Sequence, residues 1–285
     1  MTHPACRGAS DRERGYYHEL GERLLDASVD MGTKLQRLFD AETTNFGLPY
    51  GVLSRVDPVN DDYHVEVGYG PHPKLQAGET LPLSETYCRK TVEEGTLRID
   101  DAPVEGWAED PAYRNCGFDT YVGTTVEADD EVYGTLCFAS PEPRSESLTD
   151  DEVALVELLG QWASYELQQW SGPPTGADER SLEFRDVVRS PHLDSVLEAL
   201  CKRPRRLVLT GLLDGPIEVD SVAEEPDDAE RIEIRLRHVH LPKLEESGYV
   251  DWDGEDGLIR RGPSYPEAEP VLEMLGHGIE ESHCE

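Results

Sequence analysis

The sequence predicts an α+β domain, in which an antiparallel sheet is flanked by helices, followed by a smaller and mainly helical domain that ends in a β-hairpin. Two pairs of strand-like runs lie between helical patterns in the first half. A stretch rich in proline, glycine and charge separates this half from the second, which carries helical patterns and then two short strand-like runs. With 285 residues, the chain has the length of two domains.

The first domain is expected to cover residues 15–170, after a polar segment at 1–14 that we expect to be disordered. Apolar residues at close to heptad spacing predict a helix over Leu20–Phe39. Strands are predicted at Tyr50–Val56 and Tyr63–Tyr69, because the stretch between them is rich in Asp, Asn and Pro and indicates a turn. The domain is therefore predicted to begin with a helix and a hairpin.

The middle of the first domain is predicted to add a short helix, a strand and a second hairpin. The helix is expected at Leu83–Glu94, where Gly95 can end it, and the strand at Leu97–Ile99. The second hairpin is expected to pair Asp119–Glu127 with Glu131–Ala139. Together with the first hairpin, these strands form the predicted antiparallel sheet.

The last helix of the first domain has a clear N-terminal signal. Thr149 is a plausible N-cap residue, and Glu152, three positions later, completes a capping box. Apolar residues then recur at helical spacing over Val153–Trp170. This helix and Leu20–Phe39 are both amphipathic, and their heptad-like spacing would permit pairing in a helical bundle.

The second domain is expected at residues 190–262, after a linker at 171–189 and before a C-terminal extension at 263–285. Helices followed by a terminal hairpin form the outline of a winged helix-turn-helix. The first predicted helix begins at Ser190 and Pro191, a cap followed by proline at the first helical position. Further helices are predicted over Arg205–Asp214, Val219–Glu224 and Glu230–Ser247, and the hairpin strands are Tyr249–Trp252 and Gly257–Arg261.

The chain is strongly acidic, with 60 Asp and Glu against 26 Lys and Arg and a formal net charge of -34. Apolar residues make up 37% and occur in blocks, which favours packed domains over acidic disorder. A dense carboxylate surface keeps a protein soluble in concentrated salt, where its self-repulsion is screened. We therefore expect a protein of a halophilic archaeon, and local charge rather than net charge decides whether it binds nucleic acid.

The sequence gives no sign of a membrane, a metal or a catalytic centre. Its apolar runs are far shorter than the about 18–20 residues that a membrane span needs, and an export signal is not recognisable. The six cysteines include no CxxC pair and are expected to be reduced thiols of a cytoplasmic protein. No histidine pair has the spacing of a metal site, and no P-loop or nucleophile-elbow motif occurs.

A local excess of positive charge marks the helix Glu230–Ser247. Residues 229–244 hold four basic and two acidic residues, whereas residues 191–285 hold 10 basic and 23 acidic ones, a net charge of -13. Such a cationic stripe suits a recognition helix in the major groove of DNA. A solvated face with ion pairs to neighbouring carboxylates is the alternative, and the residue types leave it open.

The helical wheel divides this helix into two faces. Leu236, His240 and Leu244 repeat every four residues on one face, and Pro242 is expected to disturb the helix by removing a backbone hydrogen bond. The predicted nucleic-acid contacts are Arg231, Arg235, Arg237, His238 and Lys243 on this helix, with Arg260 and Arg261 in the hairpin as phosphate contacts.

Two segments of the second domain resemble a known family. The run His238–Val250, followed by an acidic hairpin, resembles the winged-helix domain of halophilic archaeal regulators, and Arg203–Leu209 resembles an earlier helix of that domain. The resemblance covers about residues 190–262. It implies a DNA-binding output domain.

Three segments of the first domain resemble GAF domains, which are small-molecule and light sensors of signalling proteins. They are Leu81–Cys88, Gly123–Val126 and Tyr133–Phe138, where Gly134 permits close approach of another backbone or a ligand. The resemblance implies the fold over about residues 20–170 and leaves the ligand unknown, since GAF domains bind cyclic nucleotides, tetrapyrroles, haem, metal centres or nothing known.

The resemblance places Cys88 on a helix that would edge the ligand pocket. The signatures of bilin-binding relatives are absent, since Arg89 follows Cys88, and a free cysteine usually behaves as a small apolar residue. The residues expected to line the pocket are Tyr87, Cys88, Cys116, Tyr121 and Cys137.

These features together predict a cytoplasmic transcriptional regulator, with no enzymatic activity, in which a sensor domain controls DNA binding by a winged helix. A homodimer is expected, because the GAF resemblance implies pairing of the flanking helices and a pseudo-palindromic DNA site suits a dimer. Two alternatives stay open. The winged helix could bind a partner protein in a signalling adaptor, or Cys88 and Cys116 could serve a GAF-fold cysteine-dependent reductase.

Overall fold

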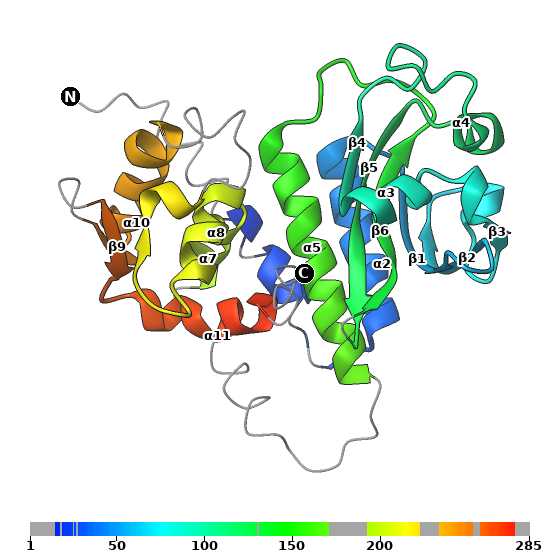
Figure 1. Cartoon of the computed structure of the whole chain (residues 1–285). Coiled ribbons are helices and arrows are strands. Elements are labelled where there is room, and N and C mark those ends of the chain that lie inside the picture. Colours follow the sequence, from blue (N-terminus) through cyan, green and yellow to red (C-terminus); the bar gives the residue numbers. More distant parts are fainter. Residues whose placement is uncertain are drawn as a thin grey trace. The chain divides into compact units, whose positions relative to one another are not determined.

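The computed structural model describes residues 15–17, 19–24, 26, 28–129, 131–170, 193–222, 234–252 and 257–276. The predicted disordered segment at 1–14 and linker at 171–189 lie outside these residues. Contacts divide the chain into two compact units. The sheet unit covers residues 26–173, and the helical unit combines the described residues before 26 with those after 173 (Figure 1).

A six-stranded antiparallel sheet forms the sheet unit, in the order β3-β2-β1-β6-β5-β4. Both predicted hairpins are confirmed, and pairing of β1 with β6 joins them at the centre. Strand β3 was not predicted, because three residues are too few to show a two-residue period. The strands are β1 (Tyr50–Asp57), β2 (Asp62–Tyr69), β3 (Thr80–Pro82), β4 (Thr96–Ile99), β5 (Thr120–Ala128) and β6 (Glu131–Ser140).

The close approach expected at Gly134 occurs at this central pairing. A Cβ atom on Gly134 would lie 1.8 Å from the backbone oxygen of Ser54 on β1. The glycine therefore lets the two hairpins join into one sheet.

Side chains of the sheet alternate between two covered faces. Phe138 on β6 faces two helices, α2 (Met31–Phe46) and α5 (Asp150–Trp170), and it meets the rings of Phe39 and Phe46 of α2. A buried ion pair between Lys34 and Glu166, 2.7 Å apart, ties α2 to α5. Cys137, the neighbour of Phe138, points to the opposite face, where it lines a pocket.

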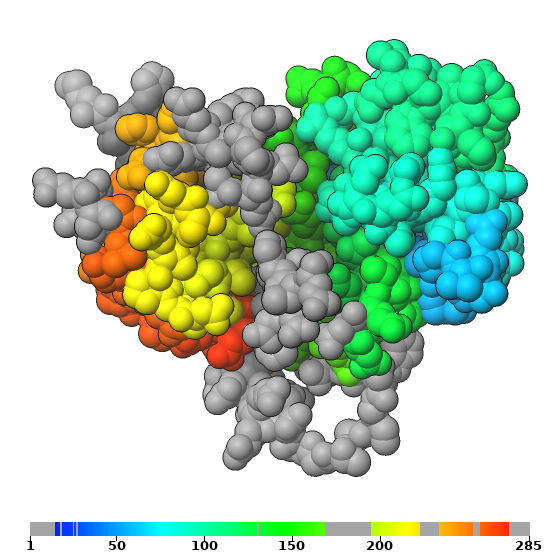
Figure 2. Space-filling view, in the orientation of Figure 1, coloured from blue at the N-terminus to red at the C-terminus, as the bar shows by residue number. Residues whose placement is uncertain are grey.

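The opposite face is covered by short elements between β2 and β5. They are the 3₁₀ turns η1 (Pro73–Leu75) and η2 (Leu83–Glu85) and the helices α3 (Cys88–Glu94) and α4 (Pro111–Cys116). Figure 2 shows the connections between β3 and β5, coloured cyan to green, forming much of the visible surface of this unit. These connections supply several of the side chains of the site described below.

Two helix predictions were wrong at their boundaries. The helix expected over Leu20–Phe39 is broken, because Asp30 accepts a hydrogen bond from the Thr33 backbone N–H at 3.0 Å and starts α2 anew. The helix expected over Leu83–Glu94 is split into η2 and α3, because Thr86 has extended backbone angles. Local polar side chains thus decided where these helices start and stop.

The capping box predicted for α5 is confirmed. The Thr149 backbone N–H donates to Glu152 Oε2 at 2.7 Å, and the Glu152 backbone N–H donates to Thr149 Oγ1 at 3.2 Å. Both bonds satisfy backbone donors that a helix start would otherwise leave unpaired.

The helical unit contains six described helical elements of known bounds and a three-stranded sheet of order β7-β9-β8. The predicted hairpin is confirmed by pairing of β8 with β9, and residues 253–256 lie outside the described residues. The elements are α7 (Leu193–Leu200), α8 (Arg203–Gly211), β7 (Ile217–Glu218), η3 (Val219–Val222), the π-turn η4 (Leu236–His240) with α10 (Leu241–Glu246), β8 (Val250–Trp252), β9 (Leu258–Arg261) and α11 (Tyr265–Gly276).

Two elements of the helical unit escaped prediction. Strand β7 has only two residues, and α11 lies in the segment expected to be an extension, where Pro266 and Pro270 obscure the helical pattern. Among the described residues, no helix is both long and apolar enough to cross a membrane.

Candidate functional site

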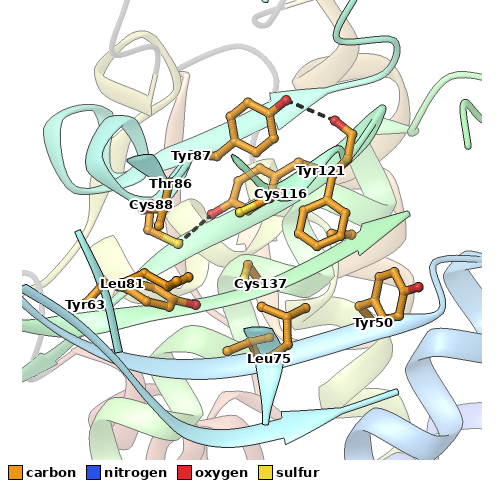
Figure 3. A pocket seen from close by; sticks show the side chains of 13 residues that line it. Tyr50, Tyr63, Leu75, Leu81, Thr86, Tyr87, Cys88, Cys116, Tyr121 and Cys137 are labelled. Carbon is orange, nitrogen blue, oxygen red and sulfur yellow. Dashed lines mark hydrogen bonds between the residues drawn. The ribbon is translucent and has the colours of Figure 1, made fainter. Parts of the chain in front are cut away.

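A pocket lies on the face of the sheet away from α2 and α5. The space between its lining atoms, including the part open to solvent, is about 380 Å³. Strands β1, β2, β5 and β6 supply its floor, and η1, η2, α3 and α4 lie over it. The lining includes five aromatic rings, which belong to Tyr50, Tyr63, Tyr87, Phe118 and Tyr121 (Figure 3).

Three thiols and a set of smaller side chains complete the lining. The thiols belong to Cys88, Cys116 and Cys137, and no disulfide joins them. The remaining lining residues are Val52, Leu75, Leu81, Thr86 and Ala139. Among the described residues that line this pocket, none is an acid, a base or a histidine.

Two of the tyrosine hydroxyls that line the pocket form hydrogen bonds within the protein. Tyr87 donates to the backbone oxygen of Phe118 at 2.9 Å (Figure 3), and the Tyr121 hydroxyl lies 2.8 Å from Thr91 Oγ1. Burial raises the pKa of both tyrosines, and that of Tyr63, above the ordinary value. These phenols therefore remain neutral and present mainly ring surface to the pocket.

Cys88 is the thiol whose surroundings favour the thiolate. A hydrogen bond with Cys137, aided by the hydroxyls of Thr135, Tyr121 and Thr86 and opposed by burial, lowers the pKa of Cys88 to about 6. The same interaction with Cys88, together with burial, raises the pKa of Cys137. The two thiols therefore titrate as a pair, in which Cys88 gives up the first proton.

Cys116 differs from the other two thiols. It is less enclosed, and burial followed by the charge of Cys88 raises its pKa to about 11. Its position at the end of α4 places it at the less buried side of the pocket. Cys116 is therefore expected to stay protonated.

A ring of contacts holds α4 against the opposite rim of the pocket. The rings of Tyr50, His72 and Phe118 meet with centroids 5.1 to 5.5 Å apart. Lys74 Nζ donates to the backbone oxygen of Asn115 at 2.8 Å, which links η1 to α4. The pocket is thus bounded by elements that are far apart in the sequence.

The five residues predicted for the pocket all lie around it: Tyr87, Cys88, Cys116, Tyr121 and Cys137. Prediction missed Tyr50 and Tyr63, which alternate with outward-facing residues on β1 and β2, and Phe118, which follows α4. Their aromatic character was visible, but their orientation toward one cavity follows from strand register and loop folding.

The second predicted site is the helical segment before the β8–β9 hairpin. Its first predicted residue, Arg231, lies outside the described residues. Leu236, His240 and Leu244 are buried, which confirms the predicted inner face. Arg235, His238 and Lys243 are exposed, together with Val239 at 44% exposure.

Pro242 explains the π-turn in this segment. Because proline has no backbone N–H and crowds the preceding turn, an ordinary helix cannot continue through it unchanged. The turn Leu236–His240 is widened, and the Leu241 N–H donates to the Leu236 oxygen. A π-turn has more residues per turn than an α-helix, so Ile234 and Val239, five positions apart, lie about one turn apart on the outer surface. Ile234 is exposed by 53%.

Not all of the predicted basic contacts are equally available. Arg237 is half-buried and pairs with Asp220 at 3.3 Å, and Arg260 is half-buried on β9. Arg261, expected at a phosphate, instead donates to the backbone oxygens of Leu212 and Leu213, both at 2.8 Å. It also pairs with a carboxylate of α11, so that its described contacts bind the helical unit together.

Comparison with known proteins finds one family model that matches part of each unit. The model of the GAF domain family matches residues 30–167, and that of a domain of unknown function, DUF7344, matches residues 197–260. Diguanylate cyclase DgcP of Escherichia coli (strain K12) is 28% identical over 134 residues, which are 40% of this chain and 39% of that protein. The chain thus spans well under half the length of this curated relative.

Solved structures similar to this chain include GAF domains. The GAF domain of a Coxiella burnetii phosphoenolpyruvate-protein phosphotransferase is 17% identical, with a TM-score of 0.46, and covers 56% of this chain and 95% of that chain. Its Acinetobacter counterpart is 14% identical, with a TM-score of 0.45 and coverage of 55% and 94%. Free methionine-R-sulfoxide reductase from Neisseria meningitidis is 16% identical, with a TM-score of 0.44 and coverage of 56% and 92%.

Proposed function

From the GAF domain that residues 30–167 form, we propose a signal-responsive transcriptional regulator, in which a ligand in the pocket controls DNA binding by the helical unit. In this proposal the helical unit acts as a winged helix, and the protein is a cytoplasmic homodimer without enzymatic activity. The acidic composition, at a net charge of -34, favours a host with concentrated internal salt.

The observation that carries the DNA-binding proposal is the exposed face of the segment 234–246. Arg235, His238 and Lys243 are exposed there, whereas the apolar residues of the opposite face are buried. A helix of this kind directly before a β-hairpin fits recognition in the major groove, with the hairpin beside the groove. In the strand order β7-β9-β8, the hairpin strand β9 also pairs with β7, which comes before the segment 234–246 in the sequence.

Electrostatics on this face are compatible with DNA despite the acidic chain. Lys243 and His238 are exposed basic side chains in a part of the chain that is otherwise acidic, since residues 191–285 carry a net charge of -13. Salt suppresses the phosphate contribution to affinity, so specific contacts by a few side chains gain importance at high salt. The proposal therefore predicts sequence-specific binding with a modest contribution from phosphates.

The test selects binding sites from a random duplex library at high KCl and then measures affinity for the enriched and a scrambled duplex. The double variant Arg235→Ala/His238→Ala is expected to weaken binding to the enriched duplex at least about tenfold, because each base contact contributes about 1–3 kcal/mol. Arg55→Ala, at a half-exposed ion pair on the sheet, is the matched control and should match the wild type. Equal affinity of the double variant and the wild type would refute the DNA-binding role.

A second function is supported by a different observation on the same face. Ile234 and Val239 are exposed by 53% and 44%, and exposed apolar side chains of this size also fit a protein partner. In that case, the helical unit of a signalling adaptor would bind a protein, and Val239→Asp would release this partner from purified complexes. Selection from the duplex library would then yield no enriched sequence.

A further inference from the structure

We propose that the pocket of the GAF domain takes a small, neutral, planar aromatic molecule of one or two rings. This inference rests on the proposed sensor function and names the chemical class of its ligand. It is drawn from the lining of the pocket: five aromatic rings, three thiols, several aliphatic side chains and no formally charged residue among the described lining residues.

The first argument is the exclusion of charge. Two basic side chains of the elements around the pocket are held in other contacts, since Lys74 donates to Asn115 and Arg89 pairs with Asp110 at 2.5 Å. An anionic ligand would lose its hydration without meeting a counter-charge, and such desolvation is costly.

The second argument is the scarcity of free hydrogen-bonding groups. The hydroxyls of Tyr87 and Tyr121 already bond to Phe118 and Thr91. A strongly polar ligand would need to break these buried bonds, and each broken bond leaves an unsatisfied group. Recognition therefore falls to ring faces and sulfur atoms, which favour an apolar, flat ligand.

The third argument is the arrangement of aromatic and aliphatic surface. Figure 3 shows Tyr87 and Tyr121 on one side of the pocket and Tyr50, Tyr63, Leu75 and Cys137 on the other. A flat ring fits between such walls, whereas a cation would lose its hydration without meeting a carboxylate among the described lining residues. Because the space of about 380 Å³ includes open solvent, the enclosed part of the pocket is smaller and admits only a small ligand.

The test compares three probes that share one ring system and differ in charge. They are 2-naphthol, which is neutral near neutral pH, naphthalene-2-sulfonate, an anion, and N,N,N-trimethylnaphthalen-2-aminium, a cation. Isothermal titration of the full chain at high KCl measures all three. We expect 2-naphthol to bind at least about tenfold more tightly than either charged probe.

Two variants at Cys116 test whether 2-naphthol binds in the pocket. Cys116→Trp fills the less enclosed side of the pocket and should abolish 2-naphthol binding, whereas Cys116→Ser preserves the space and should retain it. If Cys116→Trp does not fold, Tyr50→Leu removes a ring at the rim and should weaken 2-naphthol binding severalfold.

The outcomes separate this inference from the proposed function. Tighter binding of a charged probe would overturn the ligand class and leave a small-molecule sensor in place. Binding of 2-naphthol that Cys116→Trp does not affect, or no binding of any probe, would overturn the inference. The affinity for the enriched duplex, measured on the same samples, reports on DNA binding independently of all three probes.

Discussion

The pocket of the sheet unit and the exposed face of the segment 234–246 both differ from the acidic composition of the chain, but in different ways. The pocket of the sheet unit is lined by aromatic, aliphatic, hydroxyl and thiol side chains, with no Asp, Glu, Lys, Arg or His among its described lining residues, in a protein with 60 acidic residues. The face of the segment 234–246 exposes basic side chains in a half with a net charge of -13. The difference teaches that the acidic background describes the solvent-facing surface, whereas chemical specificity lies where that background is interrupted.

The largest expected effect breaks the pocket by breaking the sheet beneath it. In Gly134→Val, the new side chain would collide with the Ser54 backbone, since even a Cβ would lie 1.8 Å from its oxygen. We expect a loss of more than about 3 kcal/mol of unfolding free energy and of 2-naphthol binding. Denaturant unfolding at high KCl measures the stability.

The matched control for this change is Val132→Ala on the same strand, because Val132 is exposed by 38%. It should change the unfolding free energy by less than about 1 kcal/mol. A Gly134→Val protein as stable as this control would contradict the close approach of β1 and β6.

The next effect sharpens the contrast among the basic residues of the helical unit. Arg261→Ala removes two hydrogen bonds to backbone oxygens, an ion pair with Glu269 at 2.6 Å and a contact with the Tyr265 ring at 4.6 Å. We expect a loss of about 2 kcal/mol of stability. Lys243→Ala, on the exposed face, should stay within about 0.5 kcal/mol of wild type and weaken only DNA binding. Equal stability of the two variants would show that Arg261 has no structural role.

The third prediction concerns pH and separates the pocket thiols from the thiol of the helical unit. Cys137→Ala removes the main partner that lowers the pKa of Cys88, so this pKa should rise from about 6 toward an ordinary value of about 8.5. Thiolate absorbance in the ultraviolet follows the titration. Cys201→Ser, in the helical unit, should leave the low-pH transition unchanged.

The same thiol links pH to stability. Because the folded state lowers the pKa of Cys88, its thiolate stabilises the fold above the ordinary thiol pKa, and this contribution is lost as pH falls toward about 6. Wild type should therefore lose stability relative to Cys88→Ser over that interval. A constant difference between the two proteins across it would contradict a lowered pKa.

The smallest effect compares how helices begin in the two units. Helix α5 starts with the Thr149–Glu152 capping box, whereas α10 follows the π-turn and has no side-chain cap bond. Thr149→Ala should reduce stability by about 1 kcal/mol. Ser145→Ala, at an exposed position before the helix, should have almost no effect, and an equal effect of the two changes would show that the capping box contributes nothing.

Much of the sheet unit could be predicted, because its strands and the α5 cap depend on local patterns. The pocket residues Tyr87, Cys88 and Tyr121 were also found, since recognisable segments carry or flank them. Other features depend on tertiary structure. They include the two-residue strand β7 and the inward turn of Tyr63. The N-cap at Asp30 is local, but apolar residues at helical spacing on both sides of it hid the break.

The helical unit was harder to predict in its details than in its outline. Arg261 had the same residue type as Arg235, and only the path of the chain at Leu212 and Leu213 showed that its described contacts are structural. Pro242 predicted a disturbance of the helix at this position, but the sequence did not show whether the helix would bend or form a widened turn.

One measurement tests the division of roles most directly: the affinities of wild type, Arg235→Ala/His238→Ala and Cys116→Trp for both the enriched duplex and 2-naphthol at high KCl. The account predicts that the helix variant loses at least about tenfold in DNA affinity and keeps 2-naphthol binding. It predicts the loss of 2-naphthol binding in Cys116→Trp, with a folded protein that still binds DNA. A helix variant that binds the enriched duplex as tightly as wild type would contradict the account.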